Sequence, residues 1–198
     1  MNENEKVIVD DNAAAESMDN KGKKKRSSLF YWIRDIAIAL VIAAILLQFI
    51  NPTTVRQDSM MNTLNDGDYI FINKQAYNLG KVKHGDIIVF QTEDVDENGR
   101  EKKLIKRAIA LPGETIEIAD GEVYVNDEKL DEPYIREPYT DGNIERTVVP
   151  DNTVFAMGDN RAYSHDSRES DIGFISMDKL KGKAIFRIYP FGDIGTLK

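Results

Sequence analysis

The feature that most constrains this chain is an uninterrupted apolar run of twelve residues, Ile36–Leu47. Its flanks extend the apolar character over residues 29–50, close to the roughly 20 residues that an α-helix needs to span the hydrocarbon of a bilayer. Arg34 and Asp35 interrupt the stretch near its N-terminal end, where charged side chains can pair or reach the interface at modest cost. The sequence therefore predicts one transmembrane helix over residues 29–50.

A basic cluster, KGKKKR, precedes the apolar run at residues 21–26. By the positive-inside rule it keeps the N-terminus in the cytoplasm and sends the rest of the chain across the membrane. A cleaved signal peptide is one alternative, but the polar tail before the run is long and no A-x-A site follows it. A buried helix of a soluble domain is another, but it would not need flanking cations. We expect a single-pass cell-membrane protein with a disordered cytoplasmic tail over residues 1–28 and an extracytoplasmic β-rich domain over residues 51–198.

Beyond Pro52 the pattern changes to short alternating runs separated by turn residues, which is typical of β-strands. This spacing predicts a mainly β domain, an antiparallel barrel or sandwich. One short helix is expected around Ser176–Leu180, and the charged stretch at residues 92–103 reads as a hairpin tip. The predicted strands are Tyr69–Asn73, Ile87–Gln91, Leu104–Leu111, Thr115–Ala119, Glu122–Val125, Thr153–Met157 and Ala184–Tyr189.

The composition excludes several kinds of site. The net charge of −8 lies entirely in residues 51–198, because residues 1–50 carry seven basic and seven acidic side chains. This acidic balance disfavours nucleic acid as a partner. The absence of cysteine removes thiol nucleophiles, disulfides and thiolate metal sites. With only two histidines, a histidine-built metal site is not expected either.

Neither histidine is well placed as the base of a serine hydrolase. His165 lies between Ser164 and Asp166, but adjacent side chains of an extended chain point to opposite faces, so these three cannot form a triad. His84 precedes an apparent turn. We interpret both histidines as structural or solvated side chains.

A lysine can act as the base if burial lowers its pKa, because desolvation disfavours the ammonium form. In the predicted strand over residues 104–111, alternation places Lys106 on one face with Leu104, Ala108 and Ala110. A surface lysine on an edge strand is the alternative interpretation. The candidate nucleophile is Ser59, nine residues after the apolar segment, for which an ordinary solvated loop serine is the alternative.

Four sequence blocks support the choice of these two residues: SMMNTL at 59–64, GDIIVF at 85–90, KRAIALPGE at 106–114 and GDNRAYSHDSR at 158–168. In this order they resemble the bacterial type I signal peptidases, and the last block is the most specific. The resemblance covers the chain from about Phe30 to its C-terminus. It implies a membrane-anchored serine endopeptidase with a signal-peptidase-like β domain and no cofactor or metal.

By this resemblance Ser59 attacks the scissile carbonyl, while neutral Lys106 accepts its proton and later protonates the leaving amine. Ser164 matches the family's serine that orients the lysine, and Asp166 and Arg168 match the pair that braces the site. The backbone N–H of Ser59 is implied as one oxyanion donor.

The implied substrates are signal peptides of exported preproteins, cleaved after small residues at A-x-A sites. We expect a shallow apolar cleft walled by Met60, Leu64 and Ile105, with ordinary core packing as the alternative for all three. The substrate is expected to lie extended against a strand. The bilayer is the other expected partner, and a monomer is the default expectation.

Three positions depart from the family pattern. Asn62 stands where proline is usual, which predicts a less rigid turn, and Ala110 stands where glycine is common. Gln57 stands where some members have a hydroxyl that donates to the oxyanion. Donation by the Gln57 amide in its place is a hypothesis.

Other functions stay open on the sequence alone. A catalytically silent, membrane-anchored binding module of the same fold would explain the anchor and the strands, but not the serine, the lysine and the last block together. A self-cleaving repressor would carry a DNA-binding domain in place of the tail and apolar segment. A eukaryotic-type signal peptidase would have histidine at the position of Lys106.

Overall fold

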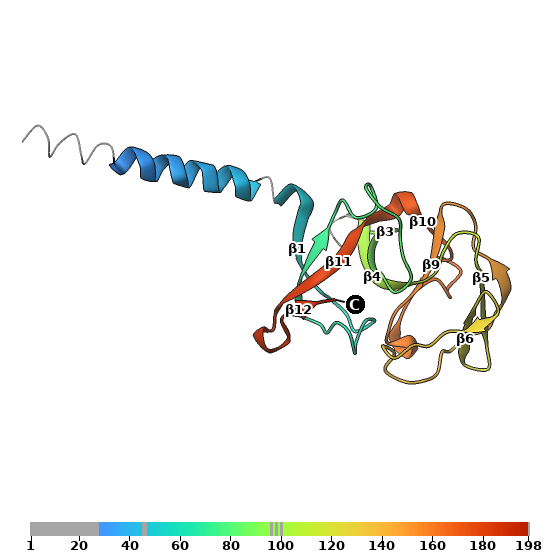
Figure 1. The fold of residues 1–198 in the computed structure, drawn as a ribbon. Coiled ribbons are helices and arrows are strands. Elements are labelled where there is room, and N and C mark those ends of the chain that lie inside the picture. Colours follow the sequence, from blue (N-terminus) through green and yellow to red (C-terminus); the bar gives the residue numbers. More distant parts are fainter. Residues whose placement is uncertain (1–27, 45–46, 96, 98, 100, 198) are drawn as a thin grey trace, which may run out of the picture. The chain divides into compact units, whose positions relative to one another are not determined.

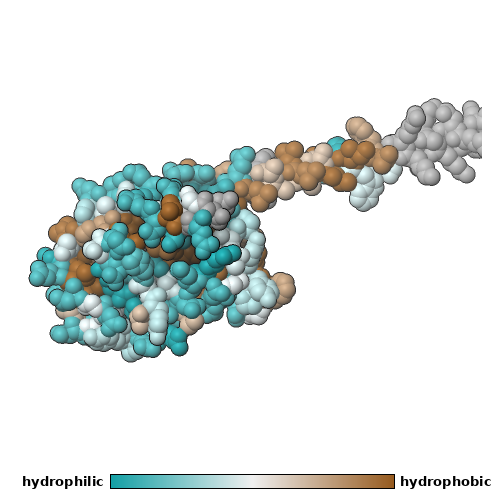
Figure 2. Space-filling view, turned by 180° about the vertical axis from the view of Figure 1, so that it is seen from behind, coloured by the Kyte–Doolittle hydropathy of each residue, from teal (hydrophilic) through white to brown (hydrophobic). Residues whose placement is uncertain are grey.

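The structure, a computed structural model, describes residues 28–44, 47–95, 97, 99 and 101–197. The chain divides into two compact units, residues 1–47 and 48–198. By its length and composition, a helix over Ser28–Phe49 could cross a membrane. Figure 2 shows hydrophobic residues along the described part of this helix. The predicted disordered tail lies outside the described residues, apart from Ser28.

The larger sheet has eight strands in the order β1-β2-β11-β3-β4-β9-β10, with β12 paired to β11 (Figure 1). All of these pairings are antiparallel. The strand bounds are β1 Ile50–Thr54, β2 Tyr69–Asn73, β3 Ile87–Val95, β4 Glu101–Ala110, β9 Thr153–Met157, β10 Ile175–Ser176, β11 Leu180–Tyr189 and β12 Gly195–Thr196.

A four-stranded antiparallel sheet has the order β7-β6-β5-β8. Its inward-facing side chains pack in one cluster with Phe155 and Met157 of β9 and Ile109 of β4, so β4 and β9 contribute to both sheets' packing. The strands are β5 Thr115–Ala119, β6 Glu122–Val125, β7 Glu128–Lys129 and β8 Ile144–Val148. Three short 3₁₀ turns complete the described elements: η1 Arg161–Tyr163, η2 Met177–Lys179 and η3 Phe191–Asp193.

Apolar clusters flank both faces of the central strands because successive side chains of a strand point to opposite faces. Ile87 and Val89 pack with Met60 and Leu64 of the loop after β1. Ile88 and Phe90 pack in a different cluster that includes Ala108 of β4. The candidate catalytic residues lie where the loop after β1 meets β4.

The prediction of a mainly β, antiparallel domain is confirmed. The predicted strands Tyr69–Asn73, Thr115–Ala119, Glu122–Val125 and Thr153–Met157 match to the residue. The expected helix around Ser176–Leu180 is only the 3₁₀ turn η2, in which the Ser176 hydroxyl accepts a hydrogen bond from the Asp178 N–H.

The predicted hairpin tip over residues 92–103 was too long. β3 continues to Val95 and β4 begins at Glu101, with these two residues paired. The extra strand residues are mostly exposed, so backbone pairing continues there without an apolar face. The prediction also missed β1, in which Pro52 is tolerated because the strand lies at the edge of the sheet.

Candidate active site

Lys106 of β4 lies in hydrogen-bonding distance of Ser59, with 2.6 Å between Lys106 Nζ and Ser59 Oγ. The ammonium form of Lys106 donates this bond to the serine hydroxyl. Once the lysine is neutral, its lone pair can instead accept the bond from the hydroxyl, which is the arrangement that a general base needs. Ser59 lies in a tight turn, in which the Met61 N–H donates to the Asp58 carbonyl and the Thr63 N–H to the Met60 carbonyl. The structure therefore brings together the two residues that the sequence predicts as nucleophile and base.

Burial lowers the pKa of Lys106 from 10.5 to about 8. Only 1 % of the residue is exposed, and it is paired opposite the buried Ile88 of β3. The negative charges of Asp166 and Asp159 act in the opposite direction and raise the pKa, while the positive charge of Arg168 lowers it further. The lowered pKa has the direction that a lysine base requires.

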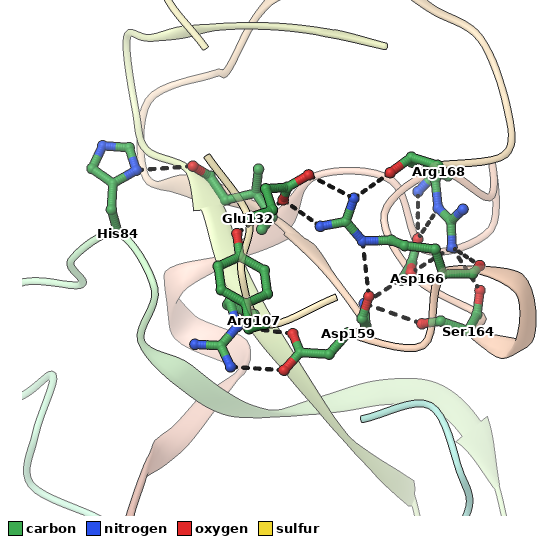
Figure 3. Close-up of polar contacts among 12 residues, drawn as sticks. His84, Arg107, Glu132, Asp159, Ser164, Asp166 and Arg168 are labelled. Carbon is green, nitrogen blue, oxygen red and sulfur yellow. Dashed lines mark hydrogen bonds and ion pairs between the residues drawn. The ribbon is translucent and has the colours of Figure 1, made fainter. Parts of the chain in front are cut away.

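Asp166 is fully buried and forms a bidentate ion pair with Arg168, whose Nε and Nη2 each lie 2.9 Å from a carboxylate oxygen. Arg168 also donates to the carbonyls of Asp141 and Arg161. Burial raises the pKa of the Asp166 carboxyl, but hydrogen bonds and the charge of Arg168 outweigh this and hold the pKa below its usual value. Asp166 is thus held as a carboxylate whose charge acts on Lys106, and Figure 3 shows its pairing with Arg168.

Ser164 contacts the same backbone group as Asp166. The Gly158 N–H donates to Ser164 Oγ at 3.1 Å and to Asp166 Oδ2 at 3.0 Å. A Cβ on Gly158 would lie 2.3 Å from both the Ser164 hydroxyl and the Ser59 carbonyl oxygen. Because glycine has no Cβ, the turn that contains Ser59 (residues 58–63, here called the nucleophile turn) and Ser164 can both pack against residue 158. Among the described side chains no hydrogen bond joins Ser164 to Lys106, so its role in orienting the lysine stays a prediction.

A buried ion pair that the sequence analysis did not assign lies next to the dyad. Arg107 binds Asp159 with both Nε and Nη2, at 2.8 and 2.7 Å (Figure 3). It also donates to Thr63 Oγ1 in the turn that carries Ser59. Its guanidinium also stacks 4.0 Å from the centroid of the Tyr134 ring. Both charged residues stand inside motif blocks, but only the fold reveals that they pair.

A second unassigned ion pair extends this network. Arg161 pairs with Glu132 and donates to Thr140 and to the Gly158 carbonyl. It thereby ties the segment before β8 to the loop that carries Gly158 (Figure 3).

The turn after the nucleophile is held by a side chain in place of a proline. Asn62 has φ +98°, in the left-handed region that proline cannot adopt. Its side-chain amide donates to the Tyr134 carbonyl at 2.8 Å. Gln57, two residues before Ser59, also has a left-handed φ of +78°, and its N–H donates to Asp66 Oδ1 at 3.0 Å.

A groove of about 640 Å³ is lined by Ser59 and by residues of β1, the loop after it and strands β2, β3 and β4. Met60 and Ile105 border it together with Ile72 and Val89, whereas Leu64 does not. Met60 and Leu64 are only 1 % and 0 % exposed and pack in the same core cluster, so the structure favours core packing for both, and the substrate-binding role of these residues stays a prediction. The groove is also lined by Asn51, Thr53, Thr54, Val55, Arg56, Gln57, Gln91, Glu101, Lys102, Lys103 and Leu104.

The two histidines contact other groups. His84 lies between the Ile109 carbonyl and the Glu114 carboxylate, and His165 contacts Asp171. The described part of the chain contains no group of three or more histidine and acidic side chains arranged to hold a metal ion.

Comparison with known proteins identifies the family. The family model "Signal peptidase, peptidase S26" matches residues 29–189. Signal peptidase I of Bacillus licheniformis is 34 % identical over 89 % of this chain and 97 % of the relative, and signal peptidase I S of Bacillus subtilis is 35 % identical over 89 % and 98 %. A solved signal peptidase I from Enterococcus faecalis is 31 % identical, with a TM-score of 0.43 over 52 % of this chain and 96 % of that chain. The chain belongs to the signal peptidase family, peptidase S26.

Proposed function

We propose that this protein is a membrane-bound serine endopeptidase that cleaves signal peptides from exported preproteins, with Ser59 as nucleophile and Lys106 as general base. The observation that carries the proposal is the 2.6 Å contact between a serine hydroxyl and a buried lysine amine whose pKa is lowered to about 8. The names of the relatives supply the substrate class.

The reaction proceeds in two halves. Neutral Lys106 takes the proton as Ser59 Oγ adds to the scissile carbonyl, and the Ser59 N–H donates to the oxygen that becomes negative. The lysine ammonium then protonates the departing amine as the C–N bond breaks, which leaves the signal peptide esterified to Ser59. Lys106, neutral again, takes a proton from a water molecule whose oxygen adds to the ester carbon. The lysine ammonium then returns this proton to Ser59 Oγ as the C–O bond breaks, which releases the signal peptide as a carboxylate and restores both residues.

Asp166 and Arg168 support this cycle electrostatically. The Asp166 carboxylate raises the pKa of Lys106 and the Arg168 guanidinium lowers it, so their two effects on the amine partly cancel. Burial is the larger effect, and it makes the net change a lowering. Ser164 lies beside this pair and is proposed to orient the lysine as it moves between its two roles.

The groove supports the proposed specificity for A-x-A sites. Ile105, next to Lys106 in the sequence, borders the groove together with Ile72 and Val89, whereas Met60, next to Ser59, is almost fully buried. Apolar walls near the nucleophile suit small side chains of an extended substrate, and the groove-lining edge of β1 offers backbone groups for it. The helix Ser28–Phe49 is proposed as the uncleaved anchor, with the N-terminus in the cytoplasm and the catalytic domain on the other face of the membrane.

The test is cleavage of a preprotein by the detergent-solubilised full-length chain, beside Ser59→Ala and Lys106→Ala, from about pH 6 to 10. Both variants should fold like the wild type and lose at least about 10³-fold of its activity. If Lys106→Ala keeps its activity, the base lies elsewhere. If Ser59→Ala keeps its activity, the nucleophile is another residue. If the wild type itself cuts no A-x-A site, the silent binding module becomes the better interpretation.

A further inference from the structure

Asn160 holds both peptide carbonyls that flank the nucleophile. Its backbone N–H donates to the Ser59 carbonyl at 3.0 Å, and its side-chain Nδ2 donates to the Asp58 carbonyl at 2.9 Å. The residue is 4 % exposed and follows Asp159, which the ion pair with Arg107 fixes in place. Thus one rigidly held residue binds the nucleophile turn on both sides of Ser59.

The contact to Asp58 bears on the catalytic N–H. The Asp58 carbonyl and the Ser59 N–H belong to one planar peptide unit, so a hydrogen bond that fixes the direction of the carbonyl also fixes the direction of the N–H. The Met61 N–H donates to the same carbonyl at 3.0 Å, which leaves that oxygen with two donors. Hydrogen bonds accepted by a carbonyl also polarise the attached N–H and make it a stronger donor.

We propose that Asn160 is a positioning residue that aligns the Ser59 N–H with the oxyanion, an inference that rests on the proposed function of Ser59. An oxyanion donor stabilises the transition state only if it already points to where the charge develops. The turn supplies one restraint on this peptide unit, the Met61 N–H that donates to the Asp58 carbonyl. The side chain of Asn160 supplies a second restraint on the same carbonyl, from a segment across the site.

The chemistry of the side chain makes the inference testable. Asn160→Asp keeps the size and shape of the residue and the backbone contact to Ser59, but it replaces the donating NH₂ with a carboxylate oxygen facing the Asp58 carbonyl. Asn160→Ser has a side chain too short to reach the Asp58 carbonyl, and it adds no charge. Asn62→Asp is the control. Asn62 lies three residues after Ser59, and its side-chain amide likewise donates to a backbone carbonyl, that of Tyr134, so the variant makes the same chemical change at a different contact.

The experiment compares two inhibitors on the full-length enzyme. One is a peptide aldehyde ending in the A-x-A sequence, which adds Ser59 Oγ to form a hemiacetal whose oxygen occupies the oxyanion position. The other is the corresponding peptide alcohol, which binds the same groove but forms no bond to the serine. Unfolded molecules bind neither inhibitor, so a partial loss of stability weakens both apparent affinities by the same factor. The ratio of the two affinities therefore stays unchanged.

We expect Asn160→Asp and Asn160→Ser to weaken aldehyde binding about 10- to 100-fold more than alcohol binding and to lower kcat with little change in KM. Asn62→Asp should change both affinities equally. Equal effects of the Asn160 variants on the two inhibitors, or an unchanged kcat, would overturn the inference. Ser59→Ala distinguishes a failure of the proposed function from a failure of the Asn160 proposal. If Ser59→Ala stays active, the proposed function is wrong. If Ser59→Ala is inactive and the Asn160 variants behave like the wild type, only the role of Asn160 is rejected.

Discussion

Lys106 Nζ lies 2.6 Å from Ser59 Oγ although the two residues are 47 positions apart in the chain. β4 holds the lysine, and a turn secured by backbone hydrogen bonds holds the serine. Only 1 % of the lysine is exposed, and this burial opposes the charged form of its amine. The burial that lowers the pKa of Lys106 therefore also costs the protein stability.

Replacement of Lys106 by an apolar residue should stabilise the fold. The pKa of Lys106 falls from 10.5 to about 8 on folding, a difference worth about 3 kcal/mol. Because the unfolded state holds its proton more tightly, this cost is fully present below pH 8 and disappears as the pH rises from 8 to 10.5. Lys106→Met should thus be inactive, yet more stable than the wild type by up to about 3 kcal/mol at pH 7.

Chemical denaturation at pH 7 and at pH 10 checks this prediction. The wild type should gain stability relative to Lys106→Met as the pH rises, and Lys103→Met on the exposed part of β4 serves as the control. A Lys106→Met protein no more stable than the wild type at pH 7 would contradict the lowered pKa.

Removal of the charge on Asp166 should shift the pH profile. Since the Asp166 carboxylate raises the pKa of Lys106, Asp166→Asn is expected to move the rising limb of kcat/KM below its wild-type midpoint near pH 8. The variant should also lose stability, because Arg168 then lacks its buried partner. Asp171→Asn, which alters an exposed carboxylate beside His165, should leave the limb in place. A shift of the Asp166→Asn limb to higher pH would show that the pair acts on the lysine in another way.

A methyl group at Gly158 should inactivate the enzyme. Its Cβ would lie 2.3 Å from the Ser59 carbonyl oxygen and from the Ser164 hydroxyl, far inside van der Waals contact. We expect Gly158→Ala to reduce kcat/KM by at least about 100-fold, since a 1 Å displacement of reacting groups has effects of this size. Gly192→Ala, where a Cβ meets no atom within 4 Å, is the control that should retain activity. Near wild-type rates for Gly158→Ala would mean that the nucleophile turn moves freely.

Loss of Arg107 should be costly because it leaves a charge buried without a partner. Arg107→Met leaves the fully buried Asp159 carboxylate without its cationic partner. Removal of one member of such a buried pair typically lowers the free energy of unfolding by about 3–5 kcal/mol. The double variant Arg107→Met/Asp159→Leu should recover a large part of this loss in urea unfolding. By comparison, Arg146→Met breaks an exposed pair with Asp127 and should barely change the unfolding midpoint. If the double variant is as unstable as the sum of its single variants, the two side chains are not coupled.

The sequence by itself determined the elements with strong local signals. Alternating apolar residues between turn residues gave Thr115–Ala119 and Glu122–Val125 their correct bounds, since half-buried strands have a period of two. The apolar stretch before Ile50 predicted the helix that the structure contains. The strand face of Lys106 left a surface lysine open, and only together with the family resemblance did it predict a buried lysine with a lowered pKa; the motif blocks singled out Ser59. The edge strand β1 escaped prediction because strands at an edge need neither a clean alternation nor every N–H.

Only the tertiary structure decided which side chains meet. Local periodicity places Lys106 on a face of β4, but the pairing of β3 with β4 and the course of the nucleophile turn set its distance from Ser59. The pairing of Arg107 with Asp159 and the grip of Asn160 on the nucleophile turn likewise join residues far apart in the chain. Such contacts depend on strand register and loop geometry, which arise from the packing of the whole domain and leave no periodic trace in the sequence.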